Sequence, residues 1–344
     1  MLSNVVASQV ALHAAFGGVV PELASREHLR NIVPVVRAAL EQAGVGFGDL
    51  DAVAVTEGPG LAGALLVGIL YAKALAFGLG RPLIAVNHLE GHIHAVLMTD
   101  RPQAREQSLL ALVVSGGHTH LYLARAAGDG LWSYRNVGRT VDDAAGEAYD
   151  KVAKLLGLGY PGGPWLDVLA GLGDPKAIAF NFHAIKSQEE GPRFDFSFSG
   201  IKSAVLRYVQ AHGMAAGIEL RRTALAHAPE ASAMEARSLC DRQTLDLIAS
   251  FQAAVVRNLL RQTFAAAETF GVGEVLVSGG VAANGELRRR FGAEAAARGL
   301  SVAFPTIALS TDNAAMIAAA AWPKFVAGQL APEDMNAVPQ LRLG

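Results

Sequence analysis

The sequence predicts an α/β protein in which buried strands end at glycine-rich turns and lead into helices. Apolar residues make up 51% of the 344 residues and charged residues only 17%, which favours a large core with strands buried on both faces. The chain contains 37 glycines. Two apolar runs end in the same triplet, Ser-Gly-Gly, at residues 115–117 and 278–280. The length predicts two domains.

Composition and charge narrow the functional class. The net charge of −2 and the pI near 6.6 give no global sign of nucleic-acid binding, and the basic runs 221–222 and 288–290 are typical of solvated helix faces. Cys240 is the single cysteine, which excludes an internal disulfide and fits a reducing, cytoplasmic location. No signal peptide is expected, because the N-terminus lacks a basic start followed by an apolar core. Residues 58–77 carry one charge, but Pro59 and several glycines interrupt them, so we expect a buried helix and no membrane span.

Apolar spacing and turn residues predict the elements of the first half in order. A short amphipathic segment precedes the turn at Gly17-Gly18, and Pro21 opens a helix that runs to residue 43 with apolar residues at helical spacing. The other expected elements are strands at 51–56, 83–86 and 109–115, a hairpin partner at 118–125, and helices from residue 61, from residue 88 and over 142–156.

The alternation continues in the second half. Helices are expected after the turn at 160–164, from Ser199 and over 245–270 and 312–321, and strands over 274–278 and 301–305. Residues 213–242 are rich in Ala, Glu and Arg but have no strong period, which predicts a flexible helical excursion. The last 20 residues predict a polar tail that contains proline.

The strand at 83–86 leads into His88-Leu89-Glu90-Gly91-His92. Two histidines four positions apart on a helix lie about 40° apart and one turn along the axis, so both rings can reach one metal ion. Glu90 would point about 200° away from the ion. In zinc proteases, by contrast, the glutamate directly follows the first histidine and acts as general base. The structural alternative is that a helix begins here and carries its histidines by chance. Three histidines (88, 92 and 94) at one tight strand-to-helix turn disfavour this alternative.

A third metal ligand must come from elsewhere in the chain. Residues 310–313, Ser-Thr-Asp-Asn, precede the alanine-rich helix, so one interpretation of Asp312 is a helix N-cap. The other is that Asp312 supplies the missing carboxylate. Two histidines and one carboxylate suit Fe(II), and zinc fits as well, so the spacing alone does not choose between the metals.

The repeated Ser-Gly-Gly triplets indicate ligand-binding loops. A glycine pair after a strand lets phosphate oxygens approach backbone N–H groups. One such loop is weak evidence, because glycine turns end many strands. Two near-copies, followed by Thr119 and Asn284, favour two lobes that grip a nucleotide between them. Asn284 also suits a helix N-cap, and the alternative for Asp150 and Lys154 is a surface ion pair of about 0.3–0.5 kcal/mol.

Seven motifs together resemble the bacterial TsaD family, the tRNA N6-adenosine threonylcarbamoyltransferases once misnamed glycoproteases. The motifs are His-x-Glu-Gly-His at 88–92, Val-Ser-Gly-Gly-His-Thr at 114–119, Asp-Asp-Ala-Ala-Gly-Glu-Ala-Tyr-Asp-Lys at 142–151, Tyr-Pro-Gly-Gly-Pro at 160–164, Phe-Ser-Phe-Ser-Gly-Ile-Lys at 196–202, Ser-Gly-Gly-Val-Ala-Ala-Asn at 278–284 and Thr-Asp-Asn-Ala-Ala-Met-Ile at 311–317.

The resemblance implies the actin/sugar-kinase/Hsp70-like (ASKHA) fold, with two lobes of related α/β topology and a nucleotide cleft. The expected divisions are an N-terminal lobe at 1–109, a C-terminal lobe at 110–310, a helix at 311–328 that returns to the N-terminal lobe, and a tail at 329–344. Family members usually begin with a strand hairpin that carries a phosphate-proximal aspartate. No segment of this sequence matches it, so we expect that hairpin to be missing and assign no catalytic residue.

The resemblance also implies the reaction and the site. The family transfers the threonylcarbamoyl group from threonylcarbamoyl-AMP to N6 of adenosine 37 in tRNAs that read codons beginning with A, which forms t6A. Metal ligands would be His88, His92 and Asp312, holding one Fe2+ per subunit, with Zn2+ as the alternative and Mg2+ accompanying the nucleotide. Substrate-binding residues would be Val113, Val114, Ser115, Gly116, Gly117, Asp150, Gly163 and Asn284. Implied partners are tRNA, a TsaB-like paralogue as heterodimer partner and a TsaE-like P-loop ATPase, with no membrane.

Two other functions compete with the transferase. A metalloprotease is disfavoured by the position of Glu90 and by the two glycine loops, which a protease does not need. A non-catalytic ASKHA-type scaffold that binds nucleotide or partner proteins is supported by the missing hairpin.

Overall fold

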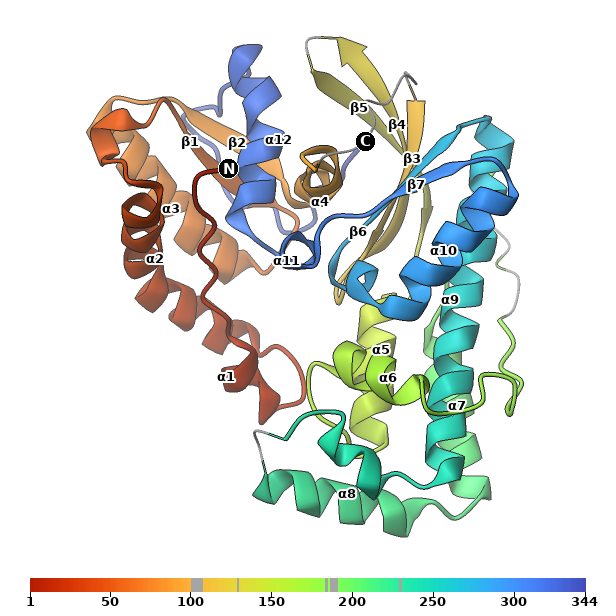
Figure 1. Cartoon of the computed structure of the whole chain (residues 1–344). Coiled ribbons are helices and arrows are strands. Elements are labelled where there is room, and N and C mark those ends of the chain that lie inside the picture. Colours follow the sequence, from red (N-terminus) through yellow and green to blue (C-terminus); the bar gives the residue numbers. More distant parts are fainter. Residues whose placement is uncertain (100–107, 129, 183–184, 186–190, 229–230) are drawn as a thin grey trace.

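The strands form two separate sheets (Figure 1). The computed structural model describes residues 1–99, 108–128, 130–182, 185, 191–228 and 231–344. A two-stranded parallel sheet joins β1 (Val53–Gly58) and β2 (Leu83–Asn87). A five-stranded sheet has the order β5-β4-β3-β6-β7, with β3 (Ser108–Val114), β4 (Thr119–Gly128), β5 (Leu131–Arg139), β6 (Glu274–Ser278) and β7 (Ser301–Ala303). The predicted α/β class is confirmed, whereas β5 was not predicted.

The smaller sheet lies in what we take as the N-terminal lobe, with helices on both faces. Alternate residues of β2 divide between two cores, as the pleat requires. Ile84 and Val86 pack with α12 (Ala314–Val326), and Leu83 and Ala85 pack with α3 (Ala62–Leu79). The long helix α2 (Pro21–Ala43) packs beside α3, and the short α1 (Val10–Ala14) precedes it.

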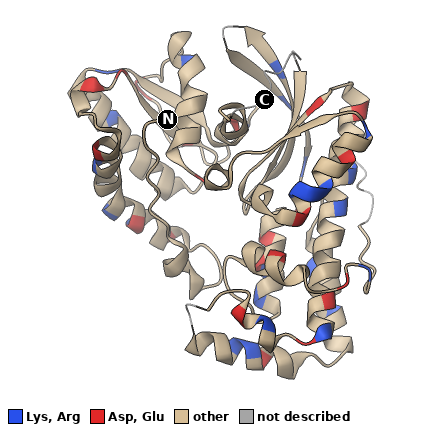
Figure 2. Cartoon of the chain, viewed as in Figure 1, with Lys and Arg blue, Asp and Glu red and all other residues tan. Residues whose placement is uncertain are grey.

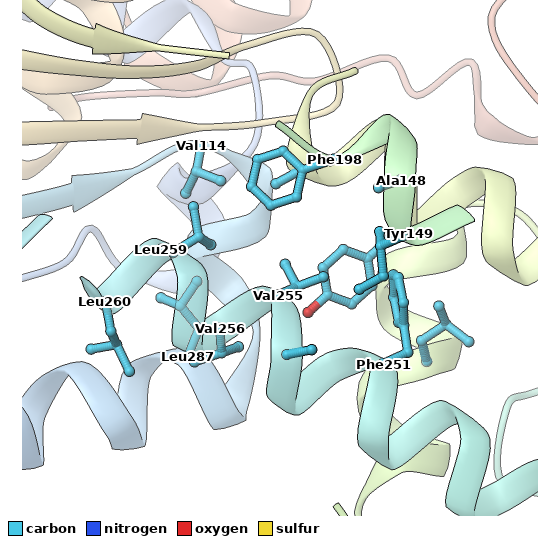
Figure 3. Packing of buried hydrophobic residues seen from close by; sticks show 14 of the residues in the cluster. Val114, Ala148, Tyr149, Phe198, Phe251, Val255, Val256, Leu259, Leu260 and Leu287 are labelled. Atoms are coloured by element: carbon cyan, nitrogen blue, oxygen red, sulfur yellow. The ribbon is translucent and has the colours of Figure 1, made fainter. Parts of the chain in front are cut away.

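The larger sheet, in what we take as the C-terminal lobe, has its main core on one face. From β3, Leu110, Leu112 and Val114 point into this core, while Leu109, Ala111 and Val113 point to the opposite face. The helices of the main core are α5 (Ala145–Leu155), α6 (Gly162–Ala170), α7 (Ser199–Ala211), α9 (Arg242–Phe270) and α10 (Gly285–Ala297). Figure 3 shows α9 at its centre, with Phe251 and Val255 beside Tyr149 of α5.

Helix α4 (His88–Leu97) lies between the two lobes (Figure 1). Every residue from 89 to 96 is buried. Leu89, Ile93 and Val96 pack on the larger sheet, whereas Ala95 packs with α12 and the smaller sheet. The histidine motif therefore sits on a helix that both lobes enclose.

The excursion at 213–242 is helical, as predicted, but it is anchored to the C-terminal lobe. It contains α8 (Ala215–His227) and a 3-10 turn, η2 (Glu235–Leu239). Arg221 is fully buried and donates hydrogen bonds to the carbonyl oxygens of Leu156 (2.8 Å) and Leu239 (3.2 Å). A hollow of about 630 Å3 lies between α8 and η2. The remaining short elements are η1 (Phe47–Asp49), η3 (Gly280–Ala283) and α11 (Ile307–Ser310).

The last residues of the chain pack against both lobes, which the prediction of a polar tail did not foresee. The amide of Ala331 donates to the carbonyl of Leu83 (2.8 Å), and that of Val338 donates to Glu57 (3.0 Å). Leu343 is buried in the small core between α4 and the larger sheet.

Replacing Phe251 with alanine tests the main core. The Phe251 ring is fully buried and meets Tyr149 edge-on at 5.2 Å between ring centroids. We expect Phe251→Ala to lower the free energy of unfolding by about 3–5 kcal/mol, because it removes apolar contacts and leaves a cavity. The measurement is urea denaturation followed by circular dichroism. The matched control is Phe77→Ala, whose ring is 91% exposed and whose loss should cost about 0.5 kcal/mol or less. Equal losses in the two variants would contradict the assigned core.

Candidate metal centre and glycine loops

The structure brings His88, His92 and Asp312 together. One ligand atom from each of the three side chains lies within 4.8 Å of the others. The Nε2 atoms of His92 and His88 are 3.2 Å and 3.7 Å from Oδ1 of Asp312. Ligands that each bind one ion at 2.0–2.2 Å lie roughly 3–3.5 Å apart, so these spacings suit a single ion.

Local sequence explains why α4 and the start of α12 converge. Asn87 caps α4, since its Oδ1 accepts a hydrogen bond from the amide of Leu89 at 2.9 Å. At Gly91 a Cβ atom would lie 2.7 Å from Cδ1 of Ile317, so glycine permits the close approach of α12. The N-cap of α12 is Asn313, whose Oδ1 accepts from the amide of Met316 (2.9 Å). Asp312 is therefore not the cap, and its carboxylate is available to the histidines.

The protonation states suit metal ligation. Burial lowers the pKa of His88, with Asp312 opposing and His92 adding to this effect, so the His88 imidazole is neutral near pH 7. Loss of contact with water would by itself raise the pKa of Asp312. The neighbouring histidines His92, His88 and His118 outweigh this effect and hold the pKa well below its usual range. The Asp312 side chain is 74% exposed, which also favours its ionised form. Neutral imidazole and ionised carboxylate are the forms that bind divalent metals.

His92 supplies an independent test of whether an ion fits. Its ring is fully buried, and neither nitrogen makes a hydrogen bond within the described chain, although Nε2 faces Asp312. A buried polar group without a partner costs about 1–3 kcal/mol. A divalent ion between His88, His92 and Asp312 would satisfy Nε2, so the donor set fits a metal.

His118 is a functional candidate that the sequence analysis missed. It directly follows Gly117, and its ring centroid is 6.1 Å from that of His88. Its pKa is lowered to about 4, chiefly by burial and then by His88 and His92, while Asp312 opposes the shift. The sequence feature that could have identified His118 is its position directly after the Ser-Gly-Gly triplet.

The two Ser-Gly-Gly loops lie side by side at one sheet, and both fall within residues 110–310, the expected C-terminal lobe. Their strands are parallel neighbours, and Val113 of β3 pairs with Ser278 of β6. Gly279 has φ +94, and a Cβ there would lie 2.3 Å from the carbonyl oxygen of Val114. The second loop therefore packs directly on the first. Both loops end at the carboxyl edge of the sheet, where open α/β sheets bind ligands.

The first loop is braced from both sides. The amide of Ser115 donates to the carbonyl of His118 (2.7 Å), and the amide of His118 donates to Oγ of Ser115 (3.1 Å). At Gly146, in the first turn of α5, a Cβ would lie 2.6 Å from the carbonyl oxygen of Ser115. Gly116 and Gly117 are exposed between these fixed points.

Asp150 meets Gly162, the residue before Gly163, where α5 contacts α6. Oδ1 of Asp150 accepts a hydrogen bond from the amide of Gly162 at 2.7 Å. Burial raises the pKa of Asp150 and Glu147 adds to this, while the Gly162 hydrogen bond opposes it. Lys154 instead donates to the carbonyl of Phe16 (3.1 Å). The surface ion pair considered for Asp150 and Lys154 is therefore wrong, because each side chain bonds to a backbone group.

Asn284 has the predicted N-cap role and also belongs to a buried network. Its Oδ1 accepts from the amide of Leu287 at 2.8 Å, and its Nδ2 donates to Oε1 of Gln252 at 2.9 Å. Nε2 of Gln252 donates to Asp167 (3.1 Å), and Asp167 also accepts from the amide of Gly285 (2.8 Å). The sequence analysis did not single out Gln252 or Asp167, although Asp167 lies one helical turn beyond Gly163.

Glu90 lies away from the metal group, as its position in the motif predicted. Its Oε2 is 2.7 Å from Nζ of Lys324 on α12. Glu90 therefore does not supply the general base that the metalloprotease alternative requires beside the histidines.

Comparison with known proteins identifies the family. The family model described as "TsaD: tRNA N6-adenosine threonylcarbamoyltransferase" matches residues 1–319. A protein of that name from Koribacter versatilis is 59% identical, with 100% of this chain and 93% of the relative covered. A protein of the same name from Symbiobacterium thermophilum is 51% identical, covering 100% of this chain and 91% of the relative.

The chain belongs to the TsaD family.

Solved structures support the fold of this TsaD-family chain. HypF from T.kodakarensis superposes with a TM-score of 0.55 at 15% identity, covering 88% of this chain and 44% of that one. Full-length HypF in its phosphate- and nucleotide-bound form gives a TM-score of 0.54 at 14% identity, covering 86% of this chain and 41% of that one. The chain thus spans less than half of either structure. These likenesses confirm the predicted ASKHA fold.

His120 should make the stability of the folded chain depend on pH. Its pKa is lowered from 6.5 to about 4, first by burial and then by His118, Arg139 and Arg193. Between these two values the unfolded chain binds a proton that the folded chain does not, so stability falls as the pH is lowered through this window. As the pH is lowered from about 7 to about 5, we expect the melting temperature of His120→Gln to fall less than that of the wild type. The measurement is differential scanning fluorimetry. Parallel melting curves for the two proteins would show that His120 does not contribute.

Proposed function

We propose that the metal group and the first glycine loop together form the place where this chain transfers a threonylcarbamoyl group to N6 of adenosine 37 in tRNA. Family membership gives the class of reaction, a transferase that acts on tRNA and forms t6A. The observation that supports the site is the position of His118. It continues the loop at 115–117, and its ring lies 6.1 Å from the ring of His88. A donor on the loop would therefore lie beside the metal group.

We assign one Fe2+ per subunit to His88, His92 and Asp312, with Zn2+ as the alternative. Two histidines and one carboxylate with open positions suit Fe(II), and the family is metal-dependent. A bound ion would supply Lewis-acid polarisation of an oxygen of the threonylcarbamoyl group. Mg2+ would accompany the nucleotide.

The residues proposed to bind threonylcarbamoyl-AMP are those at 113–117 together with Asp150, Gly163 and Asn284. Helices α5, α6 and α10 begin beside them, and helix N-termini present N–H groups and positive dipole ends to phosphate. These groups would stabilise the AMP leaving group as the mixed-anhydride bond breaks. The new bond joins N6 to the carbamoyl carbon, and N6 loses one proton. Because an adenine amine is a weak nucleophile, holding it in place is a large part of the catalytic task.

A reconstituted transfer assay tests the site. The purified chain is combined with its partner proteins, tRNA, threonine, bicarbonate and ATP, and t6A is quantified by mass spectrometry of the tRNA nucleosides. We expect His88→Ala and Asp312→Ala to lose bound iron and to reduce t6A formation by roughly 100-fold or more, because each removes a metal ligand. Asn284→Ala should mainly raise the KM for the donor.

The matched control is His227→Ala, an exposed histidine on α8 that should leave both metal content and activity unchanged. Full t6A formation by His88→Ala would contradict the metal assignment. Failure of the wild type to form any t6A with active partners would favour the scaffold alternative.

We propose that an exposed apolar face of α2 and α3 binds the TsaB-like paralogue. Leu29 of α2 is 68% exposed, and Leu70 and Phe77 of α3 are 62% and 91% exposed. Helix α3 is also the one described helix that is long and apolar enough to span a membrane, yet Leu65, Ile69 and other residues on its opposite side pack into the N-terminal lobe. Large exposed apolar patches mark protein–protein interaction sites.

Aspartate on this face tests the partner. We expect Leu70→Asp to abolish heterodimer formation with the paralogue in size-exclusion chromatography, because docking would bury the new charge. Trp322→Asp on α12, also at a well-exposed apolar residue, is the control and should leave the heterodimer intact. A heterodimer that survives Leu70→Asp would place the paralogue elsewhere.

We further propose a cytoplasmic location, where tRNA is available, and a TsaE-like P-loop ATPase as a second partner. Figure 2 shows basic and acidic residues interspersed along α8, α9 and α10. Docking of tRNA would therefore use local basic groups, consistent with the net charge of −2.

A further inference from the structure

Glu90 is a buried carboxyl group that takes no part in the metal group. Burial raises its pKa, and the adjacent Lys324 opposes this effect. Its side chain is 7% exposed, and its Oε2 lies 2.7 Å from Nζ of Lys324, whose side chain is 19% exposed. Lys324 is in the last turn of α12, the helix that begins just after Asp312. The same two helices therefore carry both the three metal ligands and this ion pair.

Helix α12 touches α4 in three places. Asp312, at its start, faces His88 and His92 on one side of α4. One turn later, Ile317 packs at Gly91. Lys324, at its end, reaches Glu90, which a helix places roughly 200° around the axis from each histidine. Figure 1 shows α12 running past α4, which is seen nearly end-on. The two polar contacts thus hold α4 from opposite sides.

We propose that Glu90 and Lys324 are positioning residues that fix the rotation of α4 about its axis, so that both histidine rings point at Asp312. The proposal rests on the metal site proposed above. Each residue of a helix turns about 100° from the last, so a small rotation of α4 would swing both rings away from the aspartate together.

The energetics of buried ion pairs support a role in geometry. Removing two charges from water costs about as much as their attraction returns, and apolar pairs of similar volume are often as stable. A pair of this kind is therefore weak evidence for stability, and its best-attested use is to select one register between packed elements. The apolar contacts of α4 with both lobes already supply the burial that holds the helix in place.

The decisive variant replaces both charges, Glu90→Met with Lys324→Met. It leaves no unpaired buried charge, so we expect the melting temperature without metal to stay near that of the wild type. The measurements are Co2+ titration by calorimetry and the visible d–d spectrum of the Co2+-loaded protein, which reports ligand geometry. We expect Co2+ affinity to fall by roughly 10- to 100-fold, as when groups that orient metal ligands are removed, with a changed spectrum.

Two further variants make the result unambiguous. The charge exchange Glu90→Lys with Lys324→Glu keeps an ion pair and should restore much of the Co2+ affinity. This variant still tests the proposal if the double methionine variant proves unstable. Glu268→Met with Arg298→Met removes an ion pair between α9 and the C-cap of α10, away from α4, and should leave Co2+ binding unchanged. Wild-type affinity and spectrum in the double methionine variant would overturn the positioning role alone. If the wild-type chain binds no Co2+, the metal assignment fails and the positioning role fails with it.

Discussion

The packing of α4 between the lobes is the constraint on which the candidate site depends. A helix buried along residues 89–96 has no free face, so its depth and direction are set by the close-packed surfaces around it. The larger sheet receives Leu89, Ile93 and Val96, and α12 closes against Gly91. Side chains on such a helix are therefore held as rigidly as the core around it. This explains how a site at an open edge can still hold two imidazoles in place, as catalytic and metal-binding groups require.

The order of parallel strands places the other half of the site. Because β3 and β6 are parallel neighbours, their carboxyl ends meet at one edge, and both Ser-Gly-Gly turns emerge there. Two glycines allow backbone segments to approach more closely than any side chain permits, Gly279 against Val114 and Gly146 against Ser115. His118 then leaves this edge toward His88, so the sheet of one lobe and the helix between the lobes contribute to one site.

The sequence predicted those features that depend on interactions between residues close in sequence. The periods of α9 and β6, the glycine turns and the histidine spacing were all readable, because each depends on residues close in sequence. Pairing between distant strands is not local, so the sequence did not reveal that β6 lies beside β3 or that the two glycine loops are in contact. The strand β5 has exposed and half-buried polar residues between its apolar ones, so it gave no clear strand signal. The residues alone left Asp312 as either a helix N-cap or a metal ligand, and the choice of ligand required the family resemblance. The Gln252–Asp167 contact could not be predicted, since a polar residue on a helix does not reveal its partner.

Charge at the site constrains how the donor can approach. His88 and His118 have lowered pKa values and are neutral, whereas Asp312 is ionised, so without a cation the metal group has a carboxylate that is not balanced by charged histidines. The proposed donor, threonylcarbamoyl-AMP, carries a phosphate and a carboxylate, and like charges a few ångströms apart repel each other. The glycine loop and the helix N-termini offer only partial positive charge. At the proposed site, an anionic donor beside Asp312 would therefore bind more favourably once a cation balances the charge of the aspartate.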